Sequence, residues 1–227
     1  MIIIGHRGAC GYEPENTIRS FKRALQDGVS MIELDVYVCA SGELVVMHDD
    51  TIDRTTNGKG AVAALTLEQL RAVDAGRGER VPLLSEVFDA INRQAVINIE
   101  LKGSGTAKPV AQLIEQYVKK GWEYSDFVVS SFDHYAVLEF HAICPQVKTG
   151  AILEGIPVGL AEFAERAHAH YAVLYYETIT RELVDDAHKR GIQVLAYTVN
   201  RVDLAKKLQA IGVDGIFTNY PNIFPRL

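Results

Sequence analysis

Residues 95–218 alternate short segments rich in β-branched and aromatic residues with longer segments whose apolar residues recur at helical spacing. Such alternation predicts strand–helix units and a parallel sheet covered by helices. Two further strand-like segments precede this region. The expected strands begin at Ile2, Met31, Val96, Phe127, Thr149, Ala172, Val194 and Gly215. Eight strands within 227 residues suit a (β/α)8 TIM barrel, which is therefore the predicted fold.

A doubly wound open sheet is the alternative arrangement of alternating strands and helices. Its dinucleotide-binding form carries Gly-x-Gly-x-x-Gly directly after a strand, and the sequence has no such fingerprint. The barrel is therefore preferred.

Residues 43–84 interrupt the regular pattern. Thr66 and Gln69 have the spacing of a capping box that opens a short helix, and Ser85 is expected to cap the helix that follows. The region is too long and irregular for a simple crossover between barrel strands. We therefore predict a single domain over residues 1–227, with a small insertion at about 43–84 after the second strand.

The composition is that of an ordinary globular protein, with 48% hydrophobic and 23% charged residues. The net charge of −6 argues against nucleic acid as a partner, because nucleic-acid binders usually present a basic surface. No apolar run approaches the length of a membrane span, so no stable membrane insertion is expected. The N-terminus does not resemble a signal peptide, and the three scattered cysteines suggest no disulfide framework. We therefore expect a cytoplasmic protein, and the oligomeric state is left open.

The predicted strand at residues 31–38 has one wholly apolar face and one face that carries Glu33 and Asp35. Side chains two residues apart on a strand point the same way, so these carboxylates lie close and repel each other unless a cation separates them. Oxygen ligands of this kind suit a hard divalent cation. A half-exposed edge strand with a solvated polar face would show the same pattern, and the strand alone does not separate the two interpretations.

Further polar residues lie where other predicted strands end. His6 and Arg7 end the first strand, and His48 closes a later short strand. Glu100 and Lys102 share one face of the third barrel strand and are expected to point inward near its end. Chemistry in barrels of this type occurs at the C-terminal ends of the strands. These residues are therefore candidates for an active site.

Each candidate also has an ordinary structural interpretation. A single buried histidine is usually a hydrogen-bonded core residue, and Glu100 and Lys102 could simply neutralise each other. Glu15 lies beside Asn16 and Thr17, which favour helix starts. Three carboxylates, two histidines and two cations at the ends of consecutive strands are nevertheless hard to explain as independent accidents.

The candidates fall within motifs that span nearly the whole chain, and the most specific of these lie in about the first sixty residues. The motifs are His6-Arg7-Gly8, Pro14-Glu15-Asn16-Thr17, Glu33-x-Asp35, His48-Asp49, Asp53-Arg54-Thr55-Thr56-Asn57-Gly58, Ile99-Glu100-Leu101-Lys102, Ser130-Ser131-Phe132-Asp133, Tyr197-Thr198-Val199-Asn200 and Gly215-Ile216-Phe217-Thr218-Asn219-Tyr220-Pro221. Together they resemble the glycerophosphodiester phosphodiesterase family. The family often has Trp where Tyr197 stands and Asp where Asn219 stands, whereas every acid–base and metal position matches.

The resemblance implies a metal-dependent phosphodiesterase that hydrolyses glycerophosphodiesters to glycerol 3-phosphate and an alcohol. It implies that Glu33, Asp35 and Glu100 hold the metal and that His6 and His48 are the general acid and base. A ligand set made only of oxygen favours Mg²⁺ or Ca²⁺ over Zn²⁺. Two points stay open: which histidine is the acid, and whether water or the substrate's own glycerol hydroxyl attacks the phosphorus.

The cationic candidates suit the same chemistry. Arg7 can hold phosphate oxygens through two parallel hydrogen bonds, and Lys102 can supply a point charge. Both are therefore assigned to substrate binding.

Three other functions compete with this interpretation. A phospholipase-D-like lyase acting on lysophospholipids could use the same barrel, but no apolar membrane-binding loop is obvious in the sequence. A non-catalytic binding protein on this barrel would have little use for both His6 and His48. A two-carboxylate glycosidase would have no use for Arg7 and Lys102 beside its carboxylates.

Overall fold

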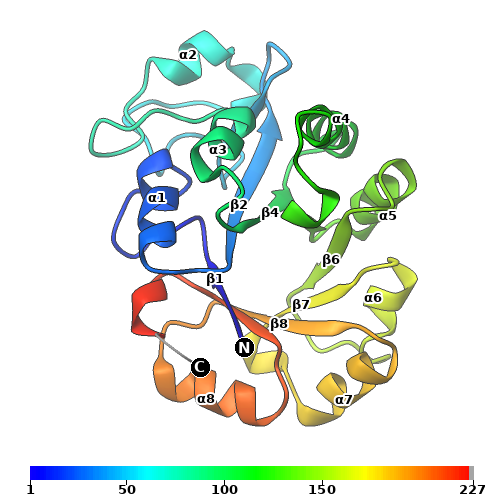
Figure 1. The fold of residues 1–227 in the computed structure, drawn as a ribbon. Helices are drawn as coiled ribbons and strands as arrows, with labels where there is room; N and C mark the ends of the chain where they lie inside the picture. The colour runs from blue at the N-terminus through cyan, green and yellow to red at the C-terminus, as the bar shows by residue number, and fades with distance from the viewer. Residues whose placement is uncertain (225–227) are drawn as a thin grey trace.

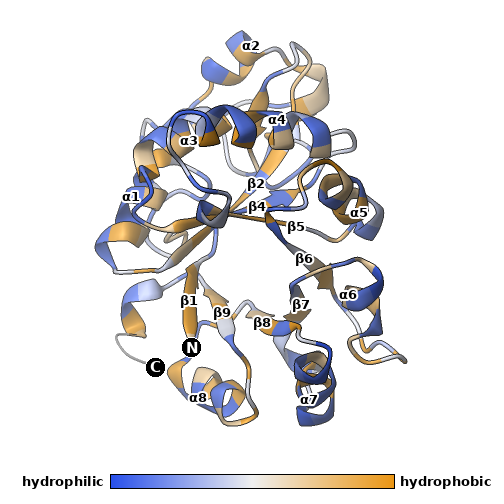
Figure 2. Cartoon of the chain, turned by 45° about the vertical axis from the view of Figure 1, so that its right-hand side comes forward, coloured by the Kyte–Doolittle hydropathy of each residue, from blue (hydrophilic) through white to orange (hydrophobic). Residues whose placement is uncertain are grey.

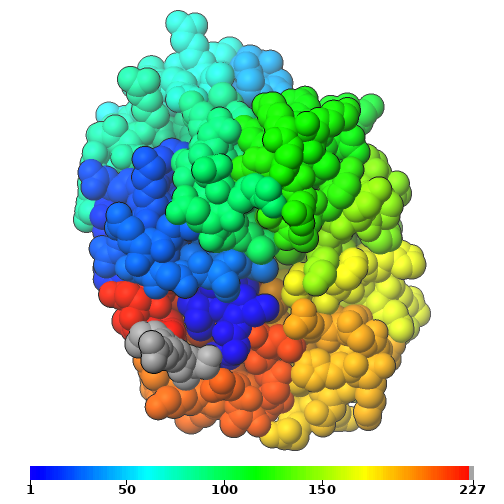
Figure 3. All heavy atoms as spheres, viewed as in Figure 1, coloured from blue at the N-terminus to red at the C-terminus, as the bar shows by residue number. Residues whose placement is uncertain are grey.

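The computed structural model describes residues 1–224, which form a closed barrel of parallel strands surrounded by helices (Figure 1). Closure depends on β1 (Ile2–Gly5), which pairs in parallel with both β2 (Met31–Val38) and β9 (Gly215–Thr218). In the space-filling view the first residues accordingly border the orange and red segments from the end of the chain (Figure 3). The TIM barrel is confirmed, and the open-sheet alternative is wrong because β1 bridges the two edges that an open sheet would leave free.

The remaining elements follow the predicted alternation. The other barrel strands are β4 (Val96–Leu101), β5 (Phe127–Ser131), β6 (Lys148–Leu153), β7 (Tyr171–Tyr175) and β8 (Gln193–Tyr197). The outer helices are α1 (Ile18–Gln26), α3 (Leu84–Ile91), α4 (Ala107–Val118), α5 (His134–Ile143), α6 (Glu162–Arg166), α7 (Arg181–Lys189) and α8 (Val202–Ala210). Short 3₁₀ helices occur at Val62–Ala64, Tyr124–Asp126, Tyr176–Thr178 and Pro221–Ile223.

Two apolar layers separate the inside of the barrel from its surroundings. On β2, Ile32 and Leu34 face outward and belong to the cluster that packs against the helices, whereas Met31 faces inward with Ile4 and Phe217. Figure 2 shows hydrophobic residues along strands such as β1 and β2, and hydrophilic residues on the helices of the outer ring. The apolar side chains inside the barrel fill one end of its interior, which leaves the C-terminal ends of the strands for polar residues.

The insertion packs beside the barrel, at the top of Figure 1. Its strand β3 (Leu44–Val46) is antiparallel to β2, and its helix α2 (Leu67–Arg71) starts at the predicted capping box. Val62 and Leu70 are fully buried in an apolar cluster of its own. The insertion thus anchors the loop that begins after β3.

Two local predictions are wrong. Ser85 is not the cap of α3: Leu83 occupies the cap position, and the Glu86 side chain accepts the Leu83 N–H at 2.9 Å. The interpretation of β2 as an edge strand also fails, because β2 lies between β1 and β4 and its first six residues are buried. Within residues 1–224, no helix has the length and apolar character needed to cross a bilayer.

Candidate active site

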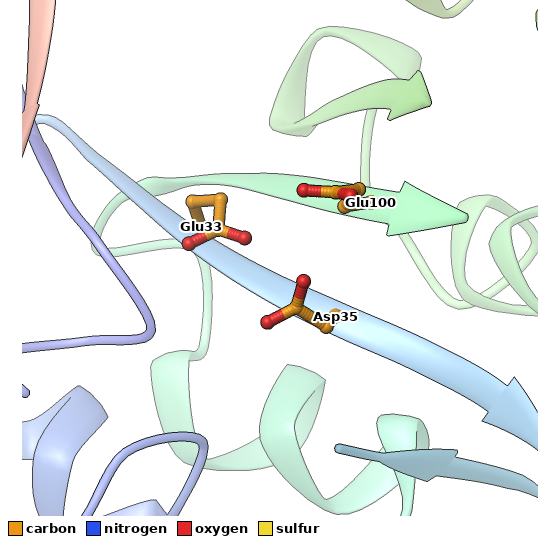
Figure 4. A group of neighbouring side chains, drawn as sticks. All are labelled: Glu33, Asp35 and Glu100. Carbon is orange, nitrogen blue, oxygen red and sulfur yellow. The ribbon is translucent and has the colours of Figure 1, made fainter. Parts of the chain in front are cut away.

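The carboxylates of Glu33, Asp35 and Glu100 form one buried group inside the barrel. Glu33 and Asp35 share the inward face of β2, and the parallel register between β2 and β4 places Glu100 beside Asp35. One oxygen from each residue lies within 4.8 Å of the others, and the three side chains turn toward a common space (Figure 4). The residues are only 3%, 0% and 8% exposed, respectively. The predicted ligand set is therefore assembled from two neighbouring strands.

The electrostatics of this carboxylate triad oppose ionisation. Burial, followed by the charges of Asp35 and Glu100, raises the pKa of Glu33 well above its usual 4.5. Burial and the charge of Glu100 raise the pKa of Asp35 to about 6. Burial also raises the pKa of Glu100, although Lys102 opposes this effect. A bound cation would offset the repulsion among the three buried carboxylates and so favour their ionised forms.

The triad fits a divalent cation on two grounds. The Oδ1 atom of Asp35 is buried without a hydrogen-bond partner, whereas Asn16 donates to the other oxygen, Oδ2, at 2.9 Å. Among residues 1–224, two cations lie against the three carboxylates: Arg7 Nε is 3.6 Å from Asp35, and Lys102 Nζ is 2.8 Å from Glu100. The cluster therefore keeps an excess of negative charge when all its carboxylates ionise, and all the ligand atoms offered are oxygens, as hard divalent cations prefer.

Lys102 is more constrained than a free phosphate-binding lysine would be. Its ammonium pairs with Glu100, lies 3.8 Å from Asp35 and is 3.4 Å from Nε2 of His48. The mutual neutralisation that the sequence left open is thus present, and Lys102 also links the triad to a candidate histidine.

His6 is held as a neutral imidazole. Its Nδ1 lies 2.7 Å from Oδ1 of Asn219, and because an amide oxygen only accepts, Nδ1 carries the proton and Nε2 is free to accept one. Burial, followed by the charge of Arg7, lowers the pKa of His6 to about 4. The ring is therefore unprotonated near neutral pH, as a general base must be.

His48 is held differently, by a carboxylate. Its Nδ1 donates to Oδ1 of Asp49 at 2.6 Å, whereas its Nε2 lies 3.4 Å from the ammonium of Lys102. The carboxylate of Asp49 thereby fixes the orientation of the ring and the position of its Nδ1 proton.

Arg7 occupies a tight turn at the end of β1. Its backbone adopts the left-handed region with φ 51°, and the following Gly8 has φ 84° and no room for a Cβ, which would lie 2.4 Å from Oγ of Ser20. In this turn the backbone N–H of Arg7 donates to Glu33 at 2.8 Å. The side-chain Nε is buried without a hydrogen-bond partner and lies 3.6 Å from Oδ2 of Asp35.

A network of carboxylates and arginines connects Arg7 with the carboxylate that holds His48. Arg54 donates to both oxygens of Glu15, at 2.7 and 2.8 Å, and to both oxygens of Asp49, at 2.7 and 2.9 Å. Glu15 in turn accepts from Arg7 at 2.8 Å. Arg54 therefore connects the residue that orients His48 with the residue that orients Arg7.

The segment expected to start a helix has a second role. Thr17 caps α1 by accepting the N–H of Ser20, as predicted. Asn16, with φ 57°, instead turns its side chain to Asp35, and Glu15 joins the arginine network. Both contacts depend on the path of the loop, which residue preferences do not specify.

A cavity of about 360 Å³ unites the candidates at the C-terminal ends of the strands. Five of the candidates line it: His6, Arg7, Glu33, His48 and Glu100. Asp35 and Lys102 do not line the cavity, but they lie 3.8 Å from each other beside these residues.

Sequence reasoning missed two further residues that line this cavity, Glu154 and Tyr175. Each lies two positions beyond an inward-facing residue, Ile152 on β6 and Val173 on β7. Following the two-residue period to the last residue of β7, and one residue past the end of β6, would have identified them.

A TIM barrel that gathers a carboxylate triad, two imidazoles and an arginine at the ends of its strands has the parts of a hydrolase acting on phosphate esters. The model of the glycerophosphoryl diester phosphodiesterase family matches residues 6–223. The glycerophosphodiester phosphodiesterase of Caldanaerobacter subterraneus subsp. tengcongensis is 38% identical, over 97% of this chain and 94% of its own length. The chain therefore belongs to the glycerophosphoryl diester phosphodiesterase family and is a phosphoric diester hydrolase.

The structural comparison agrees with this assignment. A phosphodiesterase of Oleispira antarctica, solved in complex with its product sn-glycerol-3-phosphate, superposes with a TM-score of 0.90. The two chains are 31% identical, over 98% of this chain and 94% of the other. The glycerophosphodiester phosphodiesterase of Bacillus altitudinis is 33% identical, over 97% of this chain and 95% of its own length.

Proposed function

We propose that this protein hydrolyses glycerophosphodiesters to glycerol 3-phosphate and an alcohol, with a divalent cation and two histidines. The observation that carries the proposal is the cavity lined by both imidazoles, Arg7 and two residues of the carboxylate triad, Glu33 and Glu100. The product found in the Oleispira antarctica relative supports the choice of substrate.

The cation is assigned to Glu33, Asp35 and Glu100, and the ligand chemistry favours Mg²⁺ or Ca²⁺. When bound, such an ion supplies positive charge that offsets the negative charge of the phosphate oxygens. The triad supports this assignment through its burial and through Oδ1 of Asp35, which accepts no hydrogen bond.

The histidines are assigned opposite roles. His6, neutral and with Nε2 free, takes a proton from the attacking hydroxyl. His48, backed by the carboxylate of Asp49, gives a proton to the departing alcohol. The two histidines have these same roles whether the attacking hydroxyl belongs to water or to the substrate's glycerol.

Arg7 and Lys102 are assigned to the phosphate. Arg7 lines the cavity and can offer its guanidinium to phosphate oxygens, and Lys102 adds positive charge beside Glu100. Glu15 and Arg54 keep the guanidinium of Arg7 oriented.

Release of glycerol 3-phosphate from glycerophosphodiesters in the presence of Mg²⁺ or Ca²⁺ tests the proposal. We expect His6→Ala and His48→Ala each to lower kcat by about 10²–10⁴-fold, because each removes one proton transfer. His188→Ala, which removes an exposed histidine bound to Asp214 on the outside of the barrel, should retain activity and so controls for loss of a histidine as such. Near-normal rates for either site variant, with circular dichroism unchanged, would remove that residue from the mechanism.

Lysophospholipids are a second candidate substrate class. The sequence showed no obvious apolar membrane-binding loop, yet Ile156 and Val158 in the loop after β6 are 79% and 104% exposed. A loop of this kind favours contact with a lipid surface. Comparing lysophosphatidylcholine with glycerophosphocholine in the same assay decides between the two classes.

A further inference from the structure

The two imidazoles of the site differ in the charge of the group that orients them. Nδ1 of His6 lies 2.7 Å from Oδ1 of Asn219, and Nδ1 of His48 lies 2.6 Å from Oδ1 of Asp49. The two contacts have nearly the same geometry, because the side chains of Asn and Asp have the same shape. They differ in charge: a carboxylate attracts the positive charge of a protonated imidazole, and a neutral amide adds no such charge. The residue at position 219 therefore affects the protonation of His6 as well as its orientation.

The position of Asn219 is fixed through its backbone. Its N–H donates to Oδ1 of Asn200 at 2.9 Å, and its carbonyl accepts the N–H of Gly11 at 2.9 Å. The same oxygen of Asn200 accepts the hydroxyl of Thr218 at 3.2 Å. Gly11 can approach this closely because it has no Cβ, which would lie 2.2 Å from the ring of Tyr220. The turn after β9 is thus tied to the loops after β8 and β1, which sets the direction of the Asn219 side chain.

The groups that face His6 leave its ring uncharged. Burial, followed by the charge of Arg7, lowers the pKa of His6 to about 4. His48 adds to this effect, whereas the amide hydrogen bond and the charge of Glu15 oppose it without overcoming it. The thiol of Cys10 lies 4.0 Å from Nδ1, and burial raises its pKa to about 12, so it adds no charge. A carboxylate in place of the amide would add a negative charge directly at the ring.

We propose that Asn219 is a positioning residue of the reaction: it holds the proton of His6 on Nδ1 without charging the ring, so that Nε2 stays free to accept a proton in acidic solution. Within residues 1–224, Nε2 of His6 forms no hydrogen bond. The inference rests on the proposed function, in which His6 is the base. It adds that this role depends on an uncharged acceptor at position 219, because a carboxylate of the same shape would favour the protonated ring.

The pH dependence of kcat/KM tests the role of Asn219. Asn219→Asp keeps an acceptor at Nδ1 and adds a negative charge. We expect the acid limb of the profile to move to higher pH by about 1–2 pH units, because a protonated ring cannot accept a proton. Relative to the wild type, kcat/KM should therefore fall about tenfold more at pH 6 than at pH 9.

Asn222→Asp is a matched control. It makes the same change later in the same turn, where Asn222 accepts the hydroxyl of Tyr12 at 2.6 Å, and it should leave the acid limb in place. An equal displacement in both variants would overturn the inference, because it would reflect net charge alone.

A spectroscopic measurement separates this inference from the proposed reaction. Long-range ¹H–¹⁵N spectra of histidine-labelled protein in Mg²⁺ report which ring nitrogen carries the proton, and His6→Ala identifies the signals of His6. We expect the proton on Nδ1, and a higher pKa of His6 in Asn219→Asp but not in Asn222→Asp. A proton on Nε2, or an unchanged pKa in Asn219→Asp, would overturn the role of Asn219. A raised pKa without a displaced acid limb would retain that control of His6 and refute His6 as the base of the proposed reaction.

Discussion

Arg54 is the residue on which the geometry of the site most depends without touching the cavity. Its guanidinium is bonded to both oxygens of Glu15 and of Asp49, and these carboxylates hold Arg7 and His48. Two groups that the proposed mechanism assigns to one phosphate are thereby oriented by a single planar side chain. A lysine could not reproduce this arrangement, because an ammonium is a point charge rather than a rigid fork of donors.

We predict that Arg54→Ala lowers kcat by about tenfold, since small displacements of catalytic groups are costly. Arg19→Ala is a matched control: Arg19 is similarly exposed, at 47% against 49%, and also lies near two carboxylates, Glu13 and Glu79. Steady-state kinetics and circular dichroism on both variants check the prediction. Equal losses in the two variants would show that Arg54 acts only through general stability.

Glu33 illustrates a site residue that opposes stability. Its folded-state pKa lies above its usual 4.5, so its contribution to stability is fully present below about pH 4.5 and is lost as the pH rises through the folded-state pKa. Without a cation, the ionised carboxylate therefore destabilises the fold at alkaline pH.

We predict that Glu33→Gln raises the Tm of the chelator-treated protein by several degrees at pH 8 and by much less at pH 4, while it lowers activity. Glu139→Gln, at an exposed position of α5, controls for the change in net charge. Thermal unfolding of the three proteins at both pH values provides the measurement. A lower Tm for Glu33→Gln at pH 8 would mean that its backbone hydrogen bond to Arg7 outweighs the repulsion.

At the scale of elements, periodicity explains what could be predicted. Strand alternation places Glu33, Asp35 and Glu100 on inward faces whatever the details of the barrel, and the helical spacing of apolar residues places the helices outside. The bounds of β2 agree with the prediction at both ends.

Contacts made by loops could not be predicted in the same way. Arg54 and Glu15 are 39 residues apart, and nothing in the sequence periodicity brings them together. The cap of α3 is a smaller instance: Ser85 suits a cap by preference, but Glu86 already satisfies the backbone N–H of Leu83, so the helix starts earlier.

This correction leads to a prediction about helix starts. Thr17→Ala should reduce the free energy of unfolding by about 1 kcal/mol, because Thr17 caps α1 and its hydroxyl also donates to Pro14. Ser85→Ala should change it by less than about 0.5 kcal/mol, because Ser85 caps nothing. Urea denaturation of both variants decides the matter, and a large loss in Ser85→Ala would restore Ser85 as a cap.

At the scale of the whole molecule, closure of the barrel assembles the site from both ends of the chain. His6 and Asn219 are 213 residues apart and hydrogen-bonded, and this contact depends on the pairing of β1 with β9. The insertion contributes His48 to the same cavity, together with Asp49 that holds it, through β3, which is bonded to β2. We therefore propose that residues 1–227 form one domain with its insertion, since the site is incomplete without either part.

The central claim is that the carboxylate triad binds the divalent cation on which cleavage depends. The most direct test is to titrate Mg²⁺ or Ca²⁺ into chelator-treated protein while heat of binding and release of glycerol 3-phosphate are both measured. We predict that one equivalent binds, that activity returns over the same concentration range, and that Glu33→Gln and Glu100→Gln weaken both together. Full activity after chelation, or unchanged binding in these variants, would contradict the claim.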